Sequence, residues 1–115
     1  MTTLLRGGYQ SVGASRCFVV EAQFGSAWTR SASDYWTVEL RVVGADESYG
    51  RVVATLDLST RSVAAGERFV VYDDPVGFAM TDGERLRARI VSTGSPAAIS
   101  DAVLFVKVQR NARSA

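Results

Sequence analysis

Three stretches of this chain alternate apolar and polar residues with a period of two. Apolar side chains recur at Phe18, Val20, Ala22 and Phe24, at Trp36, Val38, Leu40 and Val42, and at Val52, Ala54, Leu56 and Leu58. Successive side chains of a β-strand point to opposite faces, so this period indicates strands with one buried face. No segment keeps the i, i+3, i+4, i+7 spacing of an amphipathic helix for about two turns. The pattern therefore predicts an all-β chain.

Turn residues divide the chain into about eight strands. The first is expected within residues 1–8, and the others at 16–24, 35–43, 51–58, 67–72, 76–80, 85–91 and 102–109. Asp73-Asp74-Pro75 is expected to end a strand, because proline cannot donate to a ladder. Asp82-Gly83 predicts a hairpin-type turn. The expected fold is an antiparallel β-sandwich, jelly-roll-like in its strand number.

The alternating residues are expected to share one core. Its predicted members are Phe18, Val20, Trp36, Val38, Leu40, Val52, Leu56, Phe69, Leu86, Ile90, Leu104 and Val106. The chain has 115 residues, which is typical of a single domain. We expect this domain to span residues 9–110, between an N-terminal arm at 1–8 and a polar tail at 111–115.

The N-terminal arm carries two apolar residues, Leu4 and Leu5, followed by a flexible Gly7-Gly8 joint. Two interpretations are open. Residues 1–8 could form an edge strand of the same domain, or an arm that docks on a neighbour. In the second case their deletion should weaken attachment and leave the fold intact, because they lie outside the alternating core.

The chain has few residues of the types that commonly act in catalysis. The chain contains no histidine and a single cysteine, so it lacks the commonest general base and metal ligand and cannot form an internal disulfide. Cys17 is expected to be a buried strand residue rather than a reactive thiol. We expect no enzymatic activity, no catalytic residue, no cofactor and no bound metal.

Carboxylates gather in two loops, Asp73-Asp74 and Asp82 with Glu84. If the loops met, their oxygens could hold a hard cation such as calcium. The favoured interpretation is turn chemistry, because an Asp side chain beside Pro or Gly bonds to its own backbone.

Arginines occupy one face of the strand expected at 85–91. Arg85, Arg87 and Arg89 are spaced at i, i+2 and i+4, and apolar residues take the positions between them. This row could be a solvated face paired with carboxylates across strands, or a contact with a subunit or partner, since guanidinium groups bind carboxylates bidentately. The net charge of +1 disfavours binding to nucleic acid or to an anionic membrane.

Trp28 lies in a loop of small and polar residues, either as a plug over one end of the core or as an exposed anchor for a partner. The strand expected at 102–109 is apolar on both faces, which indicates a central position or a subunit contact and predicts a homo-oligomer. The candidate partner-contact residues are Leu4, Leu5, Trp28, Arg85, Arg87 and Arg89.

The layout of residues 52–109 resembles a known family. A strand ending in LDLSTRS precedes a turn with Gly66, and DDPVGFAM, TDGERLRARI and AVLFVKVQR follow. This layout resembles the small jelly-roll proteins that tailed bacteriophages attach to their capsids as decoration proteins or head fibres. The strand–DGE–strand stretch is also similar to trimeric jelly rolls of the tumour-necrosis-factor type. The resemblance implies a trimer, a virion location and no enzymatic activity.

We therefore expect a virion structural protein that binds the outside of an assembled phage particle. Residues 1–8 lack the apolar stretch of a signal peptide, so synthesis is expected in the bacterial host cytoplasm. The alternative is a carbohydrate-binding β-sandwich module with a stacking platform formed by Trp28, Tyr35, Trp36 or Tyr49.

Overall fold

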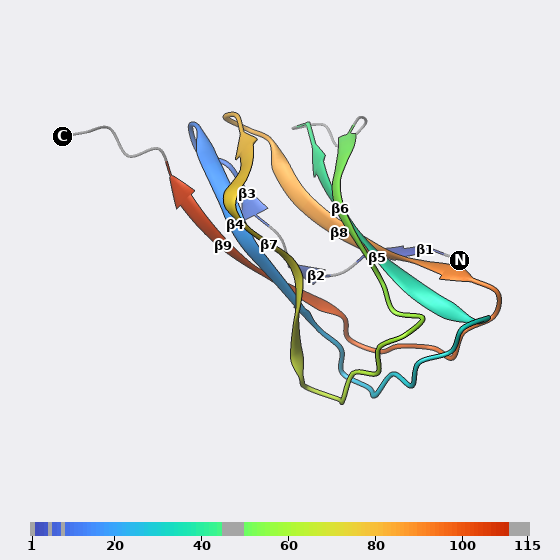
Figure 1. Ribbon diagram of the computed structural model, residues 1–115. Helices are drawn as coiled ribbons and strands as arrows, with labels where there is room; N and C mark the ends of the chain where they lie inside the picture. The colour runs from blue at the N-terminus through green and yellow to red at the C-terminus, as the bar shows by residue number, and fades with distance from the viewer. Residues whose placement is uncertain (1, 5, 8, 45–49, 111–115) are drawn as a thin grey trace.

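The chain folds as two packed β-sheets (Figure 1). The computed structural model describes residues 2–4, 6–7, 9–44 and 50–110, and no helix occurs among them. The strands are β1 (Thr2–Leu4), β2 (Arg6–Gly7), β3 (Tyr9–Gln10), β4 (Ser15–Gln23), β5 (Tyr35–Val43), β6 (Gly50–Asp57), β7 (Arg68–Met80), β8 (Arg85–Thr93) and β9 (Val103–Arg110). The predicted all-β sandwich is confirmed.

Each sheet is named here after its central strand. The β5 sheet has the order β1-β8-β5-β6, with β3 also paired to β8, and the β4 sheet has the order β2-β9-β4-β7. Neighbouring strands are antiparallel, except that β2 runs parallel to β9. From β4 onward only β5 and β6 are joined as a hairpin, and every other connection crosses between the sheets.

The turn at residues 81–84 joins the two sheets. Strand β7 before it belongs to the β4 sheet, and β8 after it belongs to the β5 sheet. The backbone N–H of Glu84 donates to the carbonyl of Thr81 at 3.1 Å, which closes a tight turn. The tight turn predicted at Asp82-Gly83 is therefore present, but the two strands that it joins do not pair as a hairpin. A local turn signal specifies a reversal of the chain but not the sheet that the next strand joins.

Strand β7 continues through Asp73-Asp74-Pro75, where the sequence predicted a strand end. Asp73 lies opposite Val19 of β4, and Phe78 lies opposite Cys17, so residues 74–77 form a bulge across from one residue of β4. Within it, Oδ1 of Asp74 accepts the backbone N–H of Val76 at 2.8 Å. Proline is tolerated because β7 is an edge strand and the bulge needs no ladder bond.

A single core fills the space between the sheets. The predicted core residues that are buried are Val20, Trp36, Val38, Leu40, Phe69, Leu86, Ile90 and Leu104. Leu56 and Val106 pack against this core but remain partly exposed. The buried core also includes Phe24, Leu58, Val63 and Met80, which lie at or beyond the strand ends.

Two bulges explain the predicted core residues that face outward. The register of β4 shifts at Phe18, so that Cys17 and Val20 are buried while Phe18 is only half-buried. The pairing of β5 with β6 shifts beside Val53, which places Val52 opposite Arg41 with 47% of its surface exposed. An extra residue inverts the alternation on its strand, so the predictions of Phe18 and Val52 as core residues are wrong.

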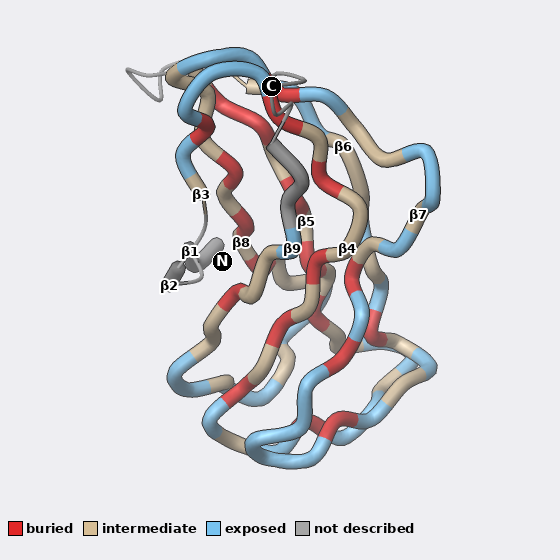
Figure 2. The backbone as a smooth tube through the Cα atoms, turned by 90° about the vertical axis from the view of Figure 1, so that its left-hand side faces the viewer, coloured by how far each residue is buried: buried red, intermediate tan, exposed pale blue. Residues whose placement is uncertain are grey.

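Residues at the N-terminus line one side of the sandwich. β1 and β3 pair with the outer edge of β8, and β2 pairs with the outer edge of β9 (Figure 2, left). The described residues of the predicted arm therefore lie along their own domain, whereas Leu5 falls outside the described residues. On the opposite side, β6 and β7 are the outermost strands (Figure 2, right).

The outer face of β9 is covered in part by a residue of its own chain. The guanidinium carbon of Arg68, from β7, lies 3.8 Å from the ring centroid of Phe105. Such a cation–π contact shields the ring while keeping the charge in water. Part of the outer apolar surface of β9 is thus covered by the same chain. In addition, β9 is an interior strand of the β4 sheet, between β2 and β4.

Candidate interface on the outer face of the β5 sheet

Strand β8 presents its arginines on one face. Leu86, Ala88 and Ile90 are buried in the core, and the three arginines that alternate with them, Arg85, Arg87 and Arg89, are half-buried on the outer face. This is the arrangement predicted from their spacing. It follows from the strand period, since inward apolar residues force the intervening side chains outward.

Strand β5 adds a fourth arginine that sequence reasoning missed. Arg41 lies directly opposite Arg87, and Glu39 lies opposite Arg89 in the antiparallel ladder. Both outward positions alternate with the buried Val38, Leu40 and Val42. The alternation alone could have placed Arg41 on this face, but only strand pairing brings β5 beside β8. We define the arginine face as Arg41, Arg85, Arg87 and Arg89.

One carboxylate bridges two members of the arginine face. Nε of Arg89 donates to Oε1 of Glu39 at 2.7 Å, and Nε of Arg41 lies 3.3 Å from the same oxygen. Nε of Arg41 makes no hydrogen bond, although it is buried. Arg85 and Arg87 take part in other interactions. Glu39 thus holds two guanidinium groups at once and fixes their positions on the sheet.

The arginine face has the chemistry to bind an acidic protein surface. Guanidinium groups accept carboxylates in a two-pronged geometry, and a β-sheet holds them at a fixed spacing. Arg41 and Arg89 keep about a third of their side-chain surface exposed, at 34% and 33%, so they can contact a partner without leaving Glu39. Such contacts would weaken as salt rises, because exposed charges are screened.

Of the two leucines predicted as contacts, Leu4 lies next to this face. Its backbone pairs opposite Arg89 at the edge of β8. Leu5 lies outside the described residues. The N-terminal segment therefore borders the arginine face along the chain's own sheet.

Trp28 lies elsewhere, as a plug over the end of the core. Its side chain is 3% exposed, and its indole N–H donates to the carbonyl of Leu58 at 3.0 Å. Its backbone also forms a two-sided bridge with Val63. The exposed-anchor interpretation does not fit this position, because the indole has no surface to offer a partner.

Two of the four aromatic residues named for the carbohydrate alternative are buried. Trp36 is 3% exposed, and its indole N–H donates to the carbonyl of Ala97 at 2.8 Å. Tyr35 is half-buried and packs against the core, and Tyr49 lies outside the described residues. With Trp28 and Trp36 both buried, two of the four named rings are unavailable for stacking on a sugar.

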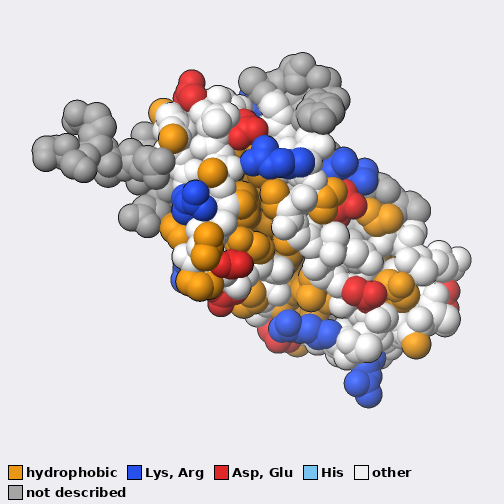
Figure 3. Space-filling view, turned by 45° about the horizontal axis from the view of Figure 1, so that its top comes forward, with side chains coloured by type: hydrophobic (Ala, Val, Ile, Leu, Met, Phe, Trp, Pro, Cys, Tyr) orange, Lys and Arg blue, Asp and Glu red, His pale blue; other side chains and the backbone are white. Residues whose placement is uncertain are grey.

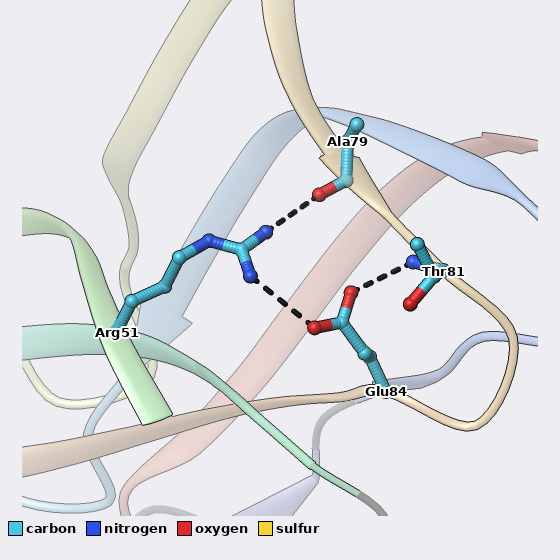
Figure 4. Close-up of polar contacts among 4 residues, drawn as sticks. All are labelled: Arg51, Ala79, Thr81 and Glu84. Atoms are coloured by element: carbon cyan, nitrogen blue, oxygen red, sulfur yellow. Dashed lines mark hydrogen bonds and ion pairs between the residues drawn. The ribbon is translucent and has the colours of Figure 1, made fainter. Parts of the chain in front are cut away.

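Asp74 and Glu84 bond to the backbone of their own turns, as favoured from the sequence, whereas Asp82 bonds to the backbone of a loop that is distant in the chain. Besides the Asp74 contact in the β7 bulge, Oδ1 of Asp82 accepts the backbone N–H of Gly13 at 2.7 Å. Oε1 of Glu84 accepts the backbone N–H of Thr81 at 2.7 Å, and Oε2 lies 3.2 Å from Nη1 of Arg51 (Figure 4). In the described part of the chain, no three His, Cys, Asp or Glu residues are grouped as metal ligands.

Arg51 of β6 connects the two sheets on the side where β6 and β7 are the outermost strands. Its Nη2 donates to the carbonyl of Ala79 in β7 at 2.8 Å, while Nη1 holds Glu84 at the start of β8 (Figure 4). The Thr81 N–H and the Arg51 guanidinium lower the pKa of Glu84 below its usual value. A pocket of about 230 Å³ beside this contact is lined by Val42, Gly44, Gly50, Arg51 and Glu84. Sequence reasoning missed this contact because its partners are brought together only by the packing of the sheets.

Comparisons with protein-family models, with curated proteins and with solved structures find no match for this chain. None of the described residues belongs to a helix long and apolar enough to cross a membrane.

Proposed function

We propose that this protein is a non-enzymatic structural protein of a virion, of the capsid-decoration or head-fibre type. In this proposal it binds the outside of an assembled phage particle and contacts other virion proteins through the arginine face. The protein is made in the host cytoplasm and acts as a homo-oligomer, for which the family resemblance implies a trimer. It needs no cofactor, nucleic acid or membrane.

The observation that carries the proposal is the arginine face itself. Two neighbouring strands bring Arg41, Arg87 and Arg89 together on a rigid sheet, with Glu39 as the carboxylate that two of them share. Arg85 continues the row along β8. An ordered set of guanidinium groups on a rigid sheet suits recognition of carboxylates on a protein partner. The layout of residues 52–109 resembles that of phage capsid-decoration proteins, and this resemblance implies that the partner is a capsid protein.

The test is co-sedimentation of the purified protein with phage particles that lack it. The wild type should sediment with the particles, and a variant with Arg85, Arg87 and Arg89 changed to Ser should not. A second variant with Arg30, Arg61 and Arg68 changed to Ser has the same net charge, but none of its substitutions lies on the arginine face, so it should still bind. Binding by the wild type should weaken as salt is raised.

Two outcomes would contradict this proposal. Equal loss of binding in both triple variants would mean that net charge, rather than the arginine face, governs attachment. A wild-type protein that ignores the particles but binds an oligosaccharide or DNA at micromolar strength would instead be a ligand-binding module.

A further inference from the structure

The arginine face concentrates positive charge on two neighbouring strands. In the ladder of β5 with β8, the outward positions hold the four arginines of this face and one carboxylate, that of Glu39. On the side where β6 and β7 are outermost, by contrast, basic side chains form separate groups between hydrophobic and acidic ones (Figure 3). The charge of the arginine face is therefore complementary to an acidic partner.

Glu39 shows how a carboxylate is held on this face. It projects outward from an extended strand, and its Oε1 lies 2.7 Å from Nε of Arg89 and 3.3 Å from Nε of Arg41. A carboxylate at an outward strand position can thus contact guanidinium groups of two strands at once. A partner that offers carboxylates from an extended backbone would repeat this contact from the solvent side.

The strand that carries three of these arginines has neighbours on both sides. β8 pairs with β5 along one edge and with β1 and β3 along the other. A partner therefore reaches the arginines of β8 over the face of the sheet, through its side chains, rather than as an added strand. Recognition then depends on how well the spacing of its carboxylates matches the spacing of the arginines.

The spacing along β8 matches that of an extended chain. Arg85, Arg87 and Arg89 follow at every second residue, so the row spans about 13 Å at a rise of about 3.3 Å per residue. An extended segment has the same rise and points alternate side chains to one side, so three carboxylates can meet three arginines. On a helix, residues i, i+4 and i+8 span about 12 Å, but the last is turned by about 80° from the first. A helix therefore presents fewer matched carboxylates to this row.

The middle of the row offers the strongest contact. Arg41 of β5 lies directly opposite Arg87 of β8, so two guanidinium groups stand side by side there. Like charges directly opposite each other on a sheet are destabilising, and a carboxylate bound between them offsets this repulsion. The middle carboxylate of an extended segment would occupy this position.

We propose that the arginine face binds an extended acidic segment of a partner protein, which lies along β8 and places carboxylates at alternate residues over Arg85, Arg87 and Arg89. This inference deepens the proposed function and rests on it, since it takes the arginine face as the contact surface. It adds the chemistry of the partner: an extended backbone, acidic side chains and a repeat of two residues.

The test is titration calorimetry at low salt with two synthetic peptides of the same composition. Both have seven residues with blocked ends, three glutamates and four threonines, since threonine favours extended backbone. The alternating peptide has glutamate at its second, fourth and sixth positions. The control peptide has glutamate at the first, fourth and seventh positions; when it is extended, the first and last lie on one side but about 20 Å apart, so only one meets the row at a time. The alternating peptide should bind about tenfold more tightly, because the control lacks two of its ion pairs.

Single variants of the protein locate the binding site. Arg87→Gln removes the guanidinium in the middle of the row and should weaken binding of the alternating peptide by about threefold or more. Arg30→Gln makes the same change of charge in the loop before β5, away from the arginine face, and should leave the affinity unchanged. If circular dichroism shows that Arg87→Gln does not fold, Arg41→Gln takes its place, because Arg41 lies opposite residue 87.

Equal affinity for the two peptides would overturn the inference, as would tighter binding of a helical peptide with glutamate at every fourth residue. Unchanged affinity in a folded Arg87→Gln variant would also overturn it. No phage particle is present in this assay. Particle binding that requires the arginine face, together with no preference between the peptides, would refute the extended segment and leave the proposed function standing. A preference for the alternating peptide without particle binding would refute the virion role alone.

Discussion

At the scale of single residues, the buried polar atoms show how the loops are fixed to the core. Trp28 and Trp36 each bury a large ring and direct the indole N–H to a backbone carbonyl, of Leu58 and Ala97 respectively. A tryptophan can be buried in this way because its one donor finds a partner. The loop tryptophan that looked available to a partner therefore stabilises the end of the sandwich.

Trp28→Phe tests this role. The substitution removes the indole N–H and leaves the carbonyl of Leu58 without its donor, so the free energy of unfolding should fall by about 1–3 kcal/mol. Urea denaturation measures the change, and particle binding by the folded variant should stay as in the wild type. Unchanged stability with lost binding would restore the anchor interpretation.

Cys17 couples stability to alkaline pH. Burial raises the pKa of its thiol from 9.0 to about 11. The folded state therefore keeps its proton in a range where the unfolded chain has lost it, and stability should decline as pH rises from about 9 to 11. Denaturation of wild type and Cys17→Ala across this range measures the effect of the thiol, which includes its contribution to the raised pKa of Tyr72. A difference between the two that does not vary with pH would contradict it.

At the scale of secondary-structure elements, the bulge of β7 sets how closely two strands approach. Gly77 has a φ of 71°, and a Cβ at this position would overlap the carbonyl oxygen of Cys17 in β4. Gly66 has a similar φ of 78°, but a Cβ there would meet no atom within 4 Å. A side chain at Gly66 would therefore meet only an unfavourable backbone conformation, whereas a side chain at Gly77 would also clash with β4.

Substitution of each glycine by alanine should reveal this difference. Gly66→Ala carries only the cost of a left-handed backbone with a side chain, about 1–2 kcal/mol. Gly77→Ala carries that cost and a clash with β4, so it should destabilise the protein more. Thermal unfolding of both variants gives the comparison, and equal melting temperatures would mean that β7 moves away from β4 at no cost.

At the scale of the whole molecule, the N-terminal segment links the two sheets. β1 pairs with the β5 sheet, β2 with the β4 sheet, and β3 again with the β5 sheet, so this short stretch closes one side of the sandwich. Deletion of residues 1–8 removes β1 and β2 and would expose the parts of the β8 and β9 edges that they cover, while β3 at residues 9–10 remains paired with β8. This differs from the expectation for a free arm, whose removal leaves the fold unaffected.

We predict that the deletion lowers the melting temperature by more than about 5 °C, since a loss of 1 kcal/mol shifts it by roughly 4–8 °C in small domains. The uncovered edges should also promote aggregation, which light scattering would detect. A deletion variant with wild-type stability that no longer sediments with particles would instead identify the segment as a docking arm.

The sequence by itself determined the fold class and most of the core. The period of two that places Val38, Leu40 and Leu86 inside is a local property, because burial of one strand face requires it. For the same reason the sequence placed Arg85, Arg87 and Arg89 on one outward face, and it identified Cys17 as a buried residue.

Only the tertiary structure decided features that depend on which strands are neighbours. It placed Arg41 beside Arg87, joined Arg51 to Ala79 and Glu84, and sent the chain after Gly83 into the other sheet. It also located the bulges that turned Phe18 and Val52 outward. Strand pairing brings together residues that are far apart in the chain, and one inserted residue inverts the alternation of buried and exposed side chains. A local sequence pattern therefore predicts neither effect.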